Sequence, residues 1–213
     1  MDYNEVLQRA RARMAPRCKV RPDCFGLCCG NTMPGPGSKA PGNGANDNWR
    51  AWRRWCLNMD TIAPNTPVDT SLELFGRTFS LPVIAAPIGS LRAQFNPEDD
   101  IRDYNACCIA AAAQTGIAAS FGDGLDARVF PHGCTLSQQY GGIRSGTDIF
   151  RALALGADAV MICRPFLISY YGGGMEGIVT YVEKLRAELT DAMYMCGARC
   201  LSDITRDMVR EVR

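Results

Sequence analysis

The stretch that decides the fold runs from Gly141 to Pro165 and reads Gly-Gly-Ile-Arg-Ser-Gly-Thr-Asp-Ile-Phe-Arg-Ala-Leu-Ala-Leu-Gly-Ala-Asp-Ala-Val-Met-Ile-Cys-Arg-Pro. Its middle part predicts a helix over 147–155, which Gly156 ends, and a short apolar strand over 159–162. A glycine-rich turn, a helix and a buried strand in this order are typical of a parallel βαβ unit.

The two ends of this stretch carry groups that bind anions. Backbone N–H groups at Gly141 and Gly142 can surround a phosphate, and the helix start that follows adds its dipole. Arg144 and Arg164 each follow a strand end and can bind the same anion. A glycine turn with two surface arginines would explain the glycine pair alone, but the combined spacing favours a phosphate site. Two consecutive strand ends that share a phosphate are typical of strands seven and eight of a (β/α)₈ barrel.

The flanking segments continue the alternation of strands and helices. Residues 81–89 form a continuously apolar run that predicts a buried strand. Asn96, followed by Pro97 and three acids, predicts a helix start, and that helix runs to about Gln114 with Gly116 after it. A second short strand is expected at 117–120, and residues 125–140 have no clear period. A long amphipathic helix is expected at 177–196, with these residues facing inward: Ile178, Val182, Leu185, Leu189 and Met193.

The N-terminal part does not show this alternation of short strands and helices. A helix is expected at 3–15, a loop rich in Gly and Pro follows at 30–47, and Trp49, Trp52 and Trp55 then recur three residues apart. A basic aromatic helix of this kind can face nucleic acid or a membrane surface. The net charge of +1 favours the alternative, in which the tryptophans face the core and the arginines face solvent.

Composition excludes several classes of protein. The chain has 23 Lys and Arg against 22 Asp and Glu, so no nucleic-acid partner and no anionic membrane is expected. No apolar run is long enough for a membrane helix, and acids at the N-terminus do not fit a signal peptide. The chain is therefore expected in the cytoplasm, where its eleven cysteines should be mostly free thiols, core packing or metal ligands and not a disulfide framework.

Four cysteines near the N-terminus form a candidate metal site. Cys18, Cys24, Cys28 and Cys29 can in principle bind zinc or an iron–sulfur cluster, but their spacing lacks paired Cys-x₂-Cys units. Unpaired thiols near a loop are the favoured interpretation, so no metal is expected. Cys107 and Cys108 are expected in the core.

The stretch from Gly141 to Phe166 closely resembles the FMN-dependent α-hydroxy-acid dehydrogenase and oxidase family, which includes glycolate oxidase, lactate oxidase and flavocytochrome b2. Three further segments resemble the same family: its N-terminal lead-in at 44–47, its first barrel strand at 74–89 and its C-terminus at 189–204. The resemblance implies a (β/α)₈ barrel that binds FMN and oxidises a 2-hydroxy acid.

The same resemblance implies roles for individual residues. Pro87, Ile88 and Gly89 would lie against the flavin ring, and Ser120 would hydrogen-bond to it. Gly141, Gly142, Arg144, Cys163 and Arg164 would hold the phosphate. The protein only positions the flavin, because the chemistry belongs to the cofactor.

Departures from the family pattern predict a truncated barrel and impaired catalysis. Residues 81–213 supply about half of the roughly 250 residues of such a barrel, and the segment with the family's catalytic His has no match. His132 is the one histidine in the chain and a weak candidate, because it lies too few residues before Gly141. The expected division is an N-terminal helical, Cys-rich extension over 1–65 and a partial barrel over 66–213, with an atypical junction at 125–140.

Two functions remain open from the sequence. The first is an FMN-binding oxidoreductase with impaired catalysis. The second is a non-catalytic half-barrel that binds FMN or phosphate as an oligomer, or a non-functional deletion product. The surviving strands would lie in the order 7-8-1-2, with open edges and an uncovered apolar face. Such edges and faces associate with other chains, so a homo-oligomer is expected.

Overall fold

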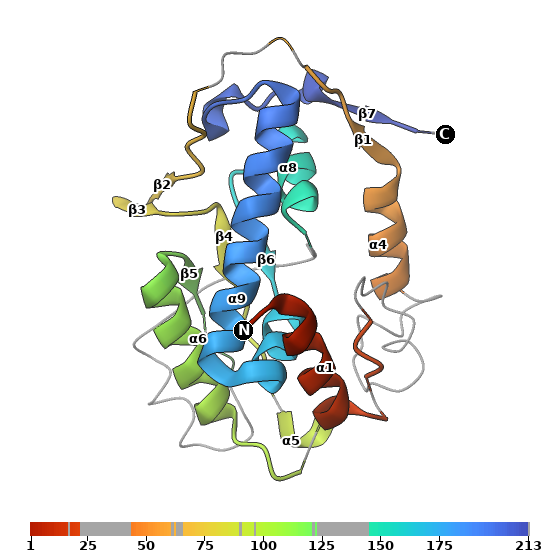
Figure 1. Ribbon diagram of the computed structural model, residues 1–213, viewed down its shortest axis with the longest axis vertical. Coiled ribbons are helices and arrows are strands. Elements are labelled where there is room, and N and C mark those ends of the chain that lie inside the picture. Colours follow the sequence, from red (N-terminus) through yellow and green to blue (C-terminus); the bar gives the residue numbers. More distant parts are fainter. Residues whose placement is uncertain are drawn as a thin grey trace.

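A three-stranded parallel sheet lies at the centre of the molecule. The structure, a computed structural model, describes residues 1–16, 18–21, 44–60, 62, 66–89, 91–95, 97–120, 122 and 145–212. In the sheet β4 (Val83–Ala85) lies between β5 (Ala118–Ala119) and β6 (Val160–Ile162), and Ile84 pairs with Ala118 on one side and Met161 on the other (Figure 1). The predicted neighbourhood of strands eight, one and two is therefore confirmed. The counterpart of strand seven falls outside the described residues.

One long helix, α9 (Arg164–Cys196), organises the helical layer. It contacts α1 (Tyr3–Met14), α6 (Ile101–Thr115) and α8 (Gly146–Ala154). Apolar side chains of these helices and one face of the sheet form the main core. The five residues predicted to face inward from the long helix are all fully buried, which confirms that periodicity: Ile178, Val182, Leu185, Leu189 and Met193.

Helix α9 begins earlier than the sequence predicted and bends in its first third. It begins directly after β6, at Arg164, and not at Gly177. Gly173 and Gly174 leave the helical conformation, and Gly174 has a φ of +57°, which a residue with a side chain rarely adopts. The bend divides α9 into a first segment, 164–172, and a second segment that runs along the sheet.

The two ends of α6 are fixed by local signals. Gly116 caps the C-terminus with a φ of +74°, as predicted. The predicted start at Asn96 is wrong, because Asp100 is the N-cap, where its carboxylate accepts a hydrogen bond from the Arg102 N–H. An Asp side chain in this position satisfies an N–H that has no partner within the helix.

The tryptophan segment is helical only in part. Helix α4 (Gly44–Arg53) carries Trp49 and Trp52, but Trp55 lies in β1 (Trp55–Leu57), which pairs antiparallel with β7 (Val209–Glu211). The prediction that all three tryptophans share one helix is therefore wrong. Trp52 and Trp55 pack against the main core, as expected for the core-facing alternative.

A hairpin covers the face of the sheet that points away from the helices. Strands β2 (Leu72–Leu74) and β3 (Arg77–Phe79) form it, and Leu74 packs against Ile84 and Met161. Ile84 is 9% exposed and Met161 4%, so the expectation of an uncovered apolar face is wrong for these strands. The remaining elements are short: α5 (Leu91–Gln94) and the 3₁₀ helices η1 (Leu201–Asp203) and η2 (Arg206–Met208).

Within the described ranges, the structure has no helix of the length and apolarity that a membrane span requires.

Candidate functional site

The C-terminal ends of the three parallel strands bring predicted site residues together. Pro87 follows β4, Ser120 follows β5 and Cys163 follows β6. The Ser120 hydroxyl donates to the Ala85 carbonyl at 2.9 Å, and the Cys163 Sγ lies 3.9 Å from the Pro87 carbonyl oxygen. We name Pro87, Ile88, Gly89, Ser120, Cys163 and Arg164 the strand-end cluster.

A close approach of two backbones shapes this cluster. A Cβ atom on Gly122 would lie only 1.9 Å from the Ile88 carbonyl oxygen, so this position requires glycine. Ile88 is buried, while Pro87 beside it is exposed. The strand-end cluster therefore combines a fixed backbone with a surface that a ligand can reach. Sequence reasoning missed this contact.

The start of α9 supplies donors to the same edge. Cys163 is the N-cap and makes no capping hydrogen bond through its side chain, and Pro165 occupies the first turn. The first N–H groups of a helix have no partner within it and carry a partial positive charge. Pro165 has no N–H and the Phe166 N–H donates to the Cys163 carbonyl at 3.1 Å, so Arg164, with its backbone N–H and guanidinium, is the residue of this turn whose donors suit an anion.

The start of α8 differs, because this chain's own carboxylate occupies it. The Gly146 N–H donates to Glu188 Oε2 at 2.9 Å, and Lys184 holds the same carboxylate. The Asp148 N–H donates to the Ser145 hydroxyl. The expectation that this helix start adds its dipole to a phosphate is therefore not met at Gly146.

Buried thiols and a tyrosine lie behind the strand-end cluster. Burial raises the pKa of Cys108 to about 12 and raises the pKa of Tyr104 well above its usual range. The pKa of Cys107 is also raised by burial. These groups are protonated at neutral pH. Cys108 is buried in the core, as predicted, whereas Cys107 is half-buried and packs against it.

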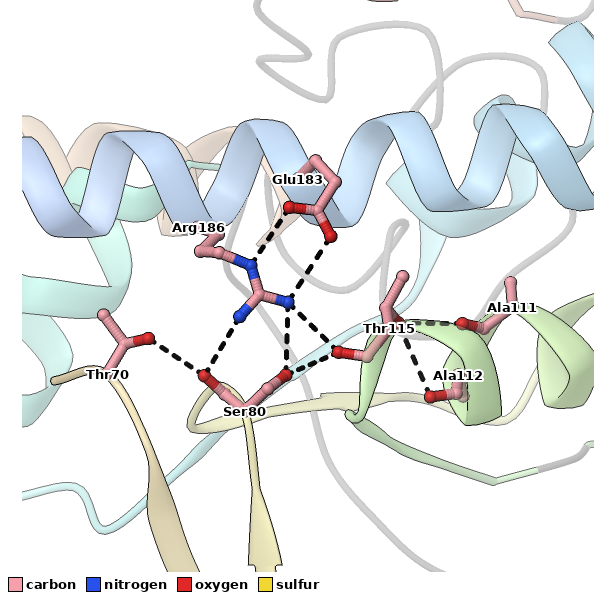
Figure 2. A network of polar contacts seen from close by, with 7 residues as sticks. All are labelled: Thr70, Ser80, Ala111, Ala112, Thr115, Glu183 and Arg186. Atoms are coloured by element: carbon pink, nitrogen blue, oxygen red, sulfur yellow. Dashed lines mark hydrogen bonds and ion pairs between the residues drawn. The ribbon is translucent and has the colours of Figure 1, made fainter.

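The opposite edge of the sheet holds a polar network around Arg186 of α9 (Figure 2). Its guanidinium donates to the Ser80 carbonyl, the Ser80 hydroxyl and the Thr115 carbonyl, at 3.1–3.4 Å, and pairs with Glu183. The Thr70 hydroxyl donates to the same Ser80 carbonyl. The network thus joins α9, the end of α6 and the connection from β3 to β4.

Several predicted site residues fall outside the described part of the chain. They are Gly141, Gly142, Arg144 and His132, together with Cys24, Cys28 and Cys29. Cys18 is described and its side chain is buried. Among the described residues, no group of three or more His, Cys, Asp or Glu side chains is placed to hold a metal ion.

The chain is similar to known proteins in family, in sequence and in fold. A family model described as FMN-dependent dehydrogenase matches residues 37–123 and 140–211. A peroxisomal (S)-2-hydroxy-acid oxidase of Oryza sativa subsp. japonica is 49% identical over 69 residues, which are 32% of this chain and 19% of that protein. An L-lactate dehydrogenase of Pseudomonas putida is 46% identical over 72 residues, which are 33% of this chain and 19% of that protein. The matched stretch thus spans about a fifth of these relatives.

Solved structures with low sequence identity share the fold. Mandelate oxidase aligns with a TM-score of 0.66 and 15% identity over 100% of this chain and 99% of that chain. An active mutant of (S)-mandelate dehydrogenase aligns with a TM-score of 0.69 and 12% identity over 99% of each chain. The two matched parts of the family model, 37–123 and 140–211, together cover most of the chain. The chain therefore belongs to the FMN-dependent dehydrogenase family, and its fold is a truncated form of that family's (β/α)₈ barrel.

Proposed function

We propose that this chain binds FMN at the strand-end cluster and oxidises 2-hydroxy acids poorly or not at all. The observation that carries the proposal is the convergence of three strand ends and the start of α9 at one edge of the sheet. In barrels of this type the C-terminal edge of the strands is the functional edge. Bound FMN supplies a flavin ring that accepts a hydride.

The residues at this edge fit the two ends of FMN. The Arg164 guanidinium and the Arg164 backbone N–H are donors that match a phosphate. Pro87, Ile88 and Gly89 would lie against the ring, and Ser120, whose hydroxyl donates to Ala85, keeps lone pairs that can accept a hydrogen bond. Cys163 would contribute its backbone N–H, with Gly141, Gly142 and Arg144 completing the phosphate site.

Impaired catalysis follows from the side chains present. The strand-end cluster contains no imidazole and no carboxylate, and loss of a positioned general base typically costs about 10²–10⁴-fold in rate. His132 is the one histidine of the chain and remains a weak candidate for this base. The substrate, if turnover occurs, would be a small 2-hydroxy acid.

The first experiment separates binding of the phosphate from binding of the ring. FMN and riboflavin are titrated into wild type, Arg164→Ala, Arg144→Ala and the control Arg77→Ala, which removes an exposed arginine of the hairpin. Each of the first two variants should weaken FMN binding by about 1.5–3 kcal/mol, because a charge-assisted contact is lost. Riboflavin binding should not change. Unchanged FMN affinity in both variants would remove the phosphate site from the proposal.

The second experiment tests catalysis. The FMN-loaded protein is mixed anaerobically with L-lactate, glycolate or mandelate, and bleaching of the flavin is followed. We expect slow bleaching or none. Absence of bleaching with intact FMN binding would favour the non-catalytic half-barrel. Rapid bleaching that disappears in His132→Ala would show that His132 is the base and that catalysis is not impaired.

We propose that the protein acts as a homo-oligomer in the cytoplasm. The argument rests on the edge of β5, which has one strand partner, β4, among the described residues. Because the neighbouring apolar face is buried, the strand edge alone carries this argument. Light scattering at high protein concentration tests it, and a stable monomer would contradict it. Cell fractionation tests the location.

A further inference from the structure

A row of packed aromatic rings crosses the region between α6, α9 and the loop after β4. Tyr104 packs edge-on against Tyr170 with ring centroids 5.4 Å apart, and Tyr170 packs against Tyr171 at 5.6 Å. Phe95 extends the row beyond Tyr171, at 6.0 Å. All three tyrosines are at most 9% exposed, so the row lies inside the protein.

Tyr171 differs from its neighbours because it has a buried acceptor for its proton. Its hydroxyl donates a hydrogen bond to Asp99 Oδ2, and Asp99 is 8% exposed. The Arg13 guanidinium lies over the ring, 5.3 Å from its centroid, and donates to the Tyr171 carbonyl. Burial and the adjacent carboxylate raise the pKa of Tyr171, so the phenol is neutral and its proton stays between the two oxygens.

Tyr104, at the other end of the row, has no such acceptor. Its side chain is fully buried, and its hydroxyl is paired with the Cys108 thiol, which is itself protonated and is not a base. The thiols of Cys108 and Cys163 lie close enough to influence its ionisation. Tyr104 therefore connects the row to the strand-end cluster without offering a place for a released proton.

We propose that Tyr171 is a redox-active tyrosine that forms a neutral radical when the protein meets a one-electron oxidant. The phenol of a tyrosine becomes a strong acid once an electron leaves it, so a buried tyrosine can be oxidised only if a base takes its proton. In the proposed step Tyr171 gives one electron to the oxidant, which is reduced, and its O–H proton moves to Asp99, which becomes a carboxylic acid. Electron return reverses both transfers.

The hydrogen-bond partners of the tyrosines in the row determine where an oxidising equivalent comes to rest. An oxidising equivalent that reaches the row comes to rest at Tyr171, because the phenol proton there has the Asp99 carboxylate as its acceptor. The oxidant belongs to the class of peroxide-derived radicals, which can form where reduced flavin meets oxygen. The radical site itself does not depend on the proposed binding of FMN, because an added oxidant can produce it in the flavin-free protein.

The experiment uses the full chain with photogenerated tris(bipyridine)ruthenium(III) as the oxidant and persulfate as the electron sink. The radical is followed by its electron paramagnetic resonance signal and its decay. Wild type should give a long-lived tyrosyl signal that Tyr171→Phe removes. Tyr104→Phe is the matched control, since it also deletes one buried hydroxyl of the same row, and it should keep the signal. Loss in Tyr104→Phe with retention in Tyr171→Phe would overturn the assignment.

Two measurements keep the proposal testable if Tyr171→Phe does not fold. Asp99→Asn keeps an oxygen that accepts the hydrogen bond but cannot take a proton, so the long-lived signal should be lost. In wild type, radical formation should be slower in D₂O, because a proton moves with the electron. A signal that persists in Asp99→Asn, or that forms equally fast in both solvents, would overturn the proposal.

Discussion

The two edges of the central sheet are built in opposite ways. At the N-terminal edge, Arg186 bonds to Ser80 and Thr115, and Thr70 completes the network with groups of this chain. At the C-terminal edge, the polar contacts of the strand-end cluster include the 2.9 Å bond from Ser120 to Ala85 and a 3.9 Å contact from Cys163 to Pro87. The first edge holds helices together, whereas the second presents a fixed backbone and a helix start.

This difference teaches where stability and ligand binding are located in a barrel fragment. In complete (β/α)₈ barrels, conserved features at the N-terminal edge serve stability and those at the C-terminal edge serve chemistry. The same division is visible here although only three parallel strands are described. Helix α6 connects the two edges, with Asp100 at one end and the Arg186 contact to Thr115 at the other. Substitutions at the two edges should therefore have different readouts.

The largest effect is expected from Gly122→Ala at the C-terminal edge. The added Cβ overlaps the Ile88 carbonyl, so the two backbones must separate. We expect a loss of about 3 kcal/mol in the free energy of unfolding, as for severe overpacking. Urea denaturation measures it. Gly156→Ala is the control, since no atom lies within 4 Å of its Cβ, and only its φ of +98° should cost about 1 kcal/mol. Equal losses of unfolding free energy in the two variants would show that the backbones of Gly122 and Ile88 are not in close contact.

Arg186→Met at the N-terminal edge should have the next largest effect. Removal of the guanidinium leaves the Ser80 and Thr115 carbonyls with fewer donors, so we expect a loss of about 2 kcal/mol in unfolding free energy. Arg186→Lys should recover only part of it, because an ammonium cannot reproduce the planar donor set. Flavin affinity of the folded variant should be unchanged. A drop in flavin affinity without a drop in stability would contradict the division between the edges.

Glu188→Gln compares the starts of α8 and α9. The neutral amide still accepts from the Gly146 N–H but loses the attraction to the helix dipole and to Lys184, so stability should fall by about 0.5–1 kcal/mol. If the phosphate binds at the start of α9, FMN affinity should stay the same. A clear gain in FMN affinity would show that the carboxylate repels a phosphate bound at α8.

The smallest effect concerns the N-cap of α6. Hydrogen bonds and the charge of Arg102 lower the pKa of Asp100 from 3.8 to about 2. Since the folded pKa is the lower one, the carboxylate stabilises the fold above pH 3.8, and this contribution is lost as the pH falls towards 2. Solvent screening keeps it below about 1 kcal/mol. Unfolding of wild type and Asp100→Asn across this range should show a pH-dependent difference that vanishes at the acid end.

Elements with a strong local signal were predictable from the sequence. The helix predicted at 3–15 is α1, which buries Val6, Ala10 and Met14 on one side, and Gly116 predicted the end of α6. Short strands whose partners lie far away in the sequence were not predictable. β1 and β7 have three residues each and no alternation, so nothing local indicates that Trp55 lies opposite Glu211. Asn96 gave a false helix start because Asp100, four residues later, is an equally good N-cap.

The sequence predicted which strand ends form the candidate site, but it did not predict the contacts that side chains make around them. The resemblance to a barrel family placed Pro87, Ser120 and Cys163 at consecutive strand ends, and the parallel register brings them together. The occupation of the Gly146 N–H by Glu188 depends on how α9 crosses α8, which no local pattern reports. The pairing of Tyr171 with Asp99 likewise joins residues 72 positions apart in the sequence.

The bend at Gly173 and Gly174 determines how far the start of α9 is from its end. A straight helix of 33 residues would be about 50 Å long. That length is more than is needed to cover the sheet. Because the axis changes direction after nine residues, the first segment lies against α1, where a Cβ on Gly172 would meet the Val6 carbonyl at 2.1 Å (Figure 1). One continuous stretch of chain thus forms a short helix beside Arg164 and a long helix ending at Cys196, and the angle between them is fixed by a close approach in which a Cβ on Gly177 would lie 2.1 Å from the Ser169 carbonyl oxygen.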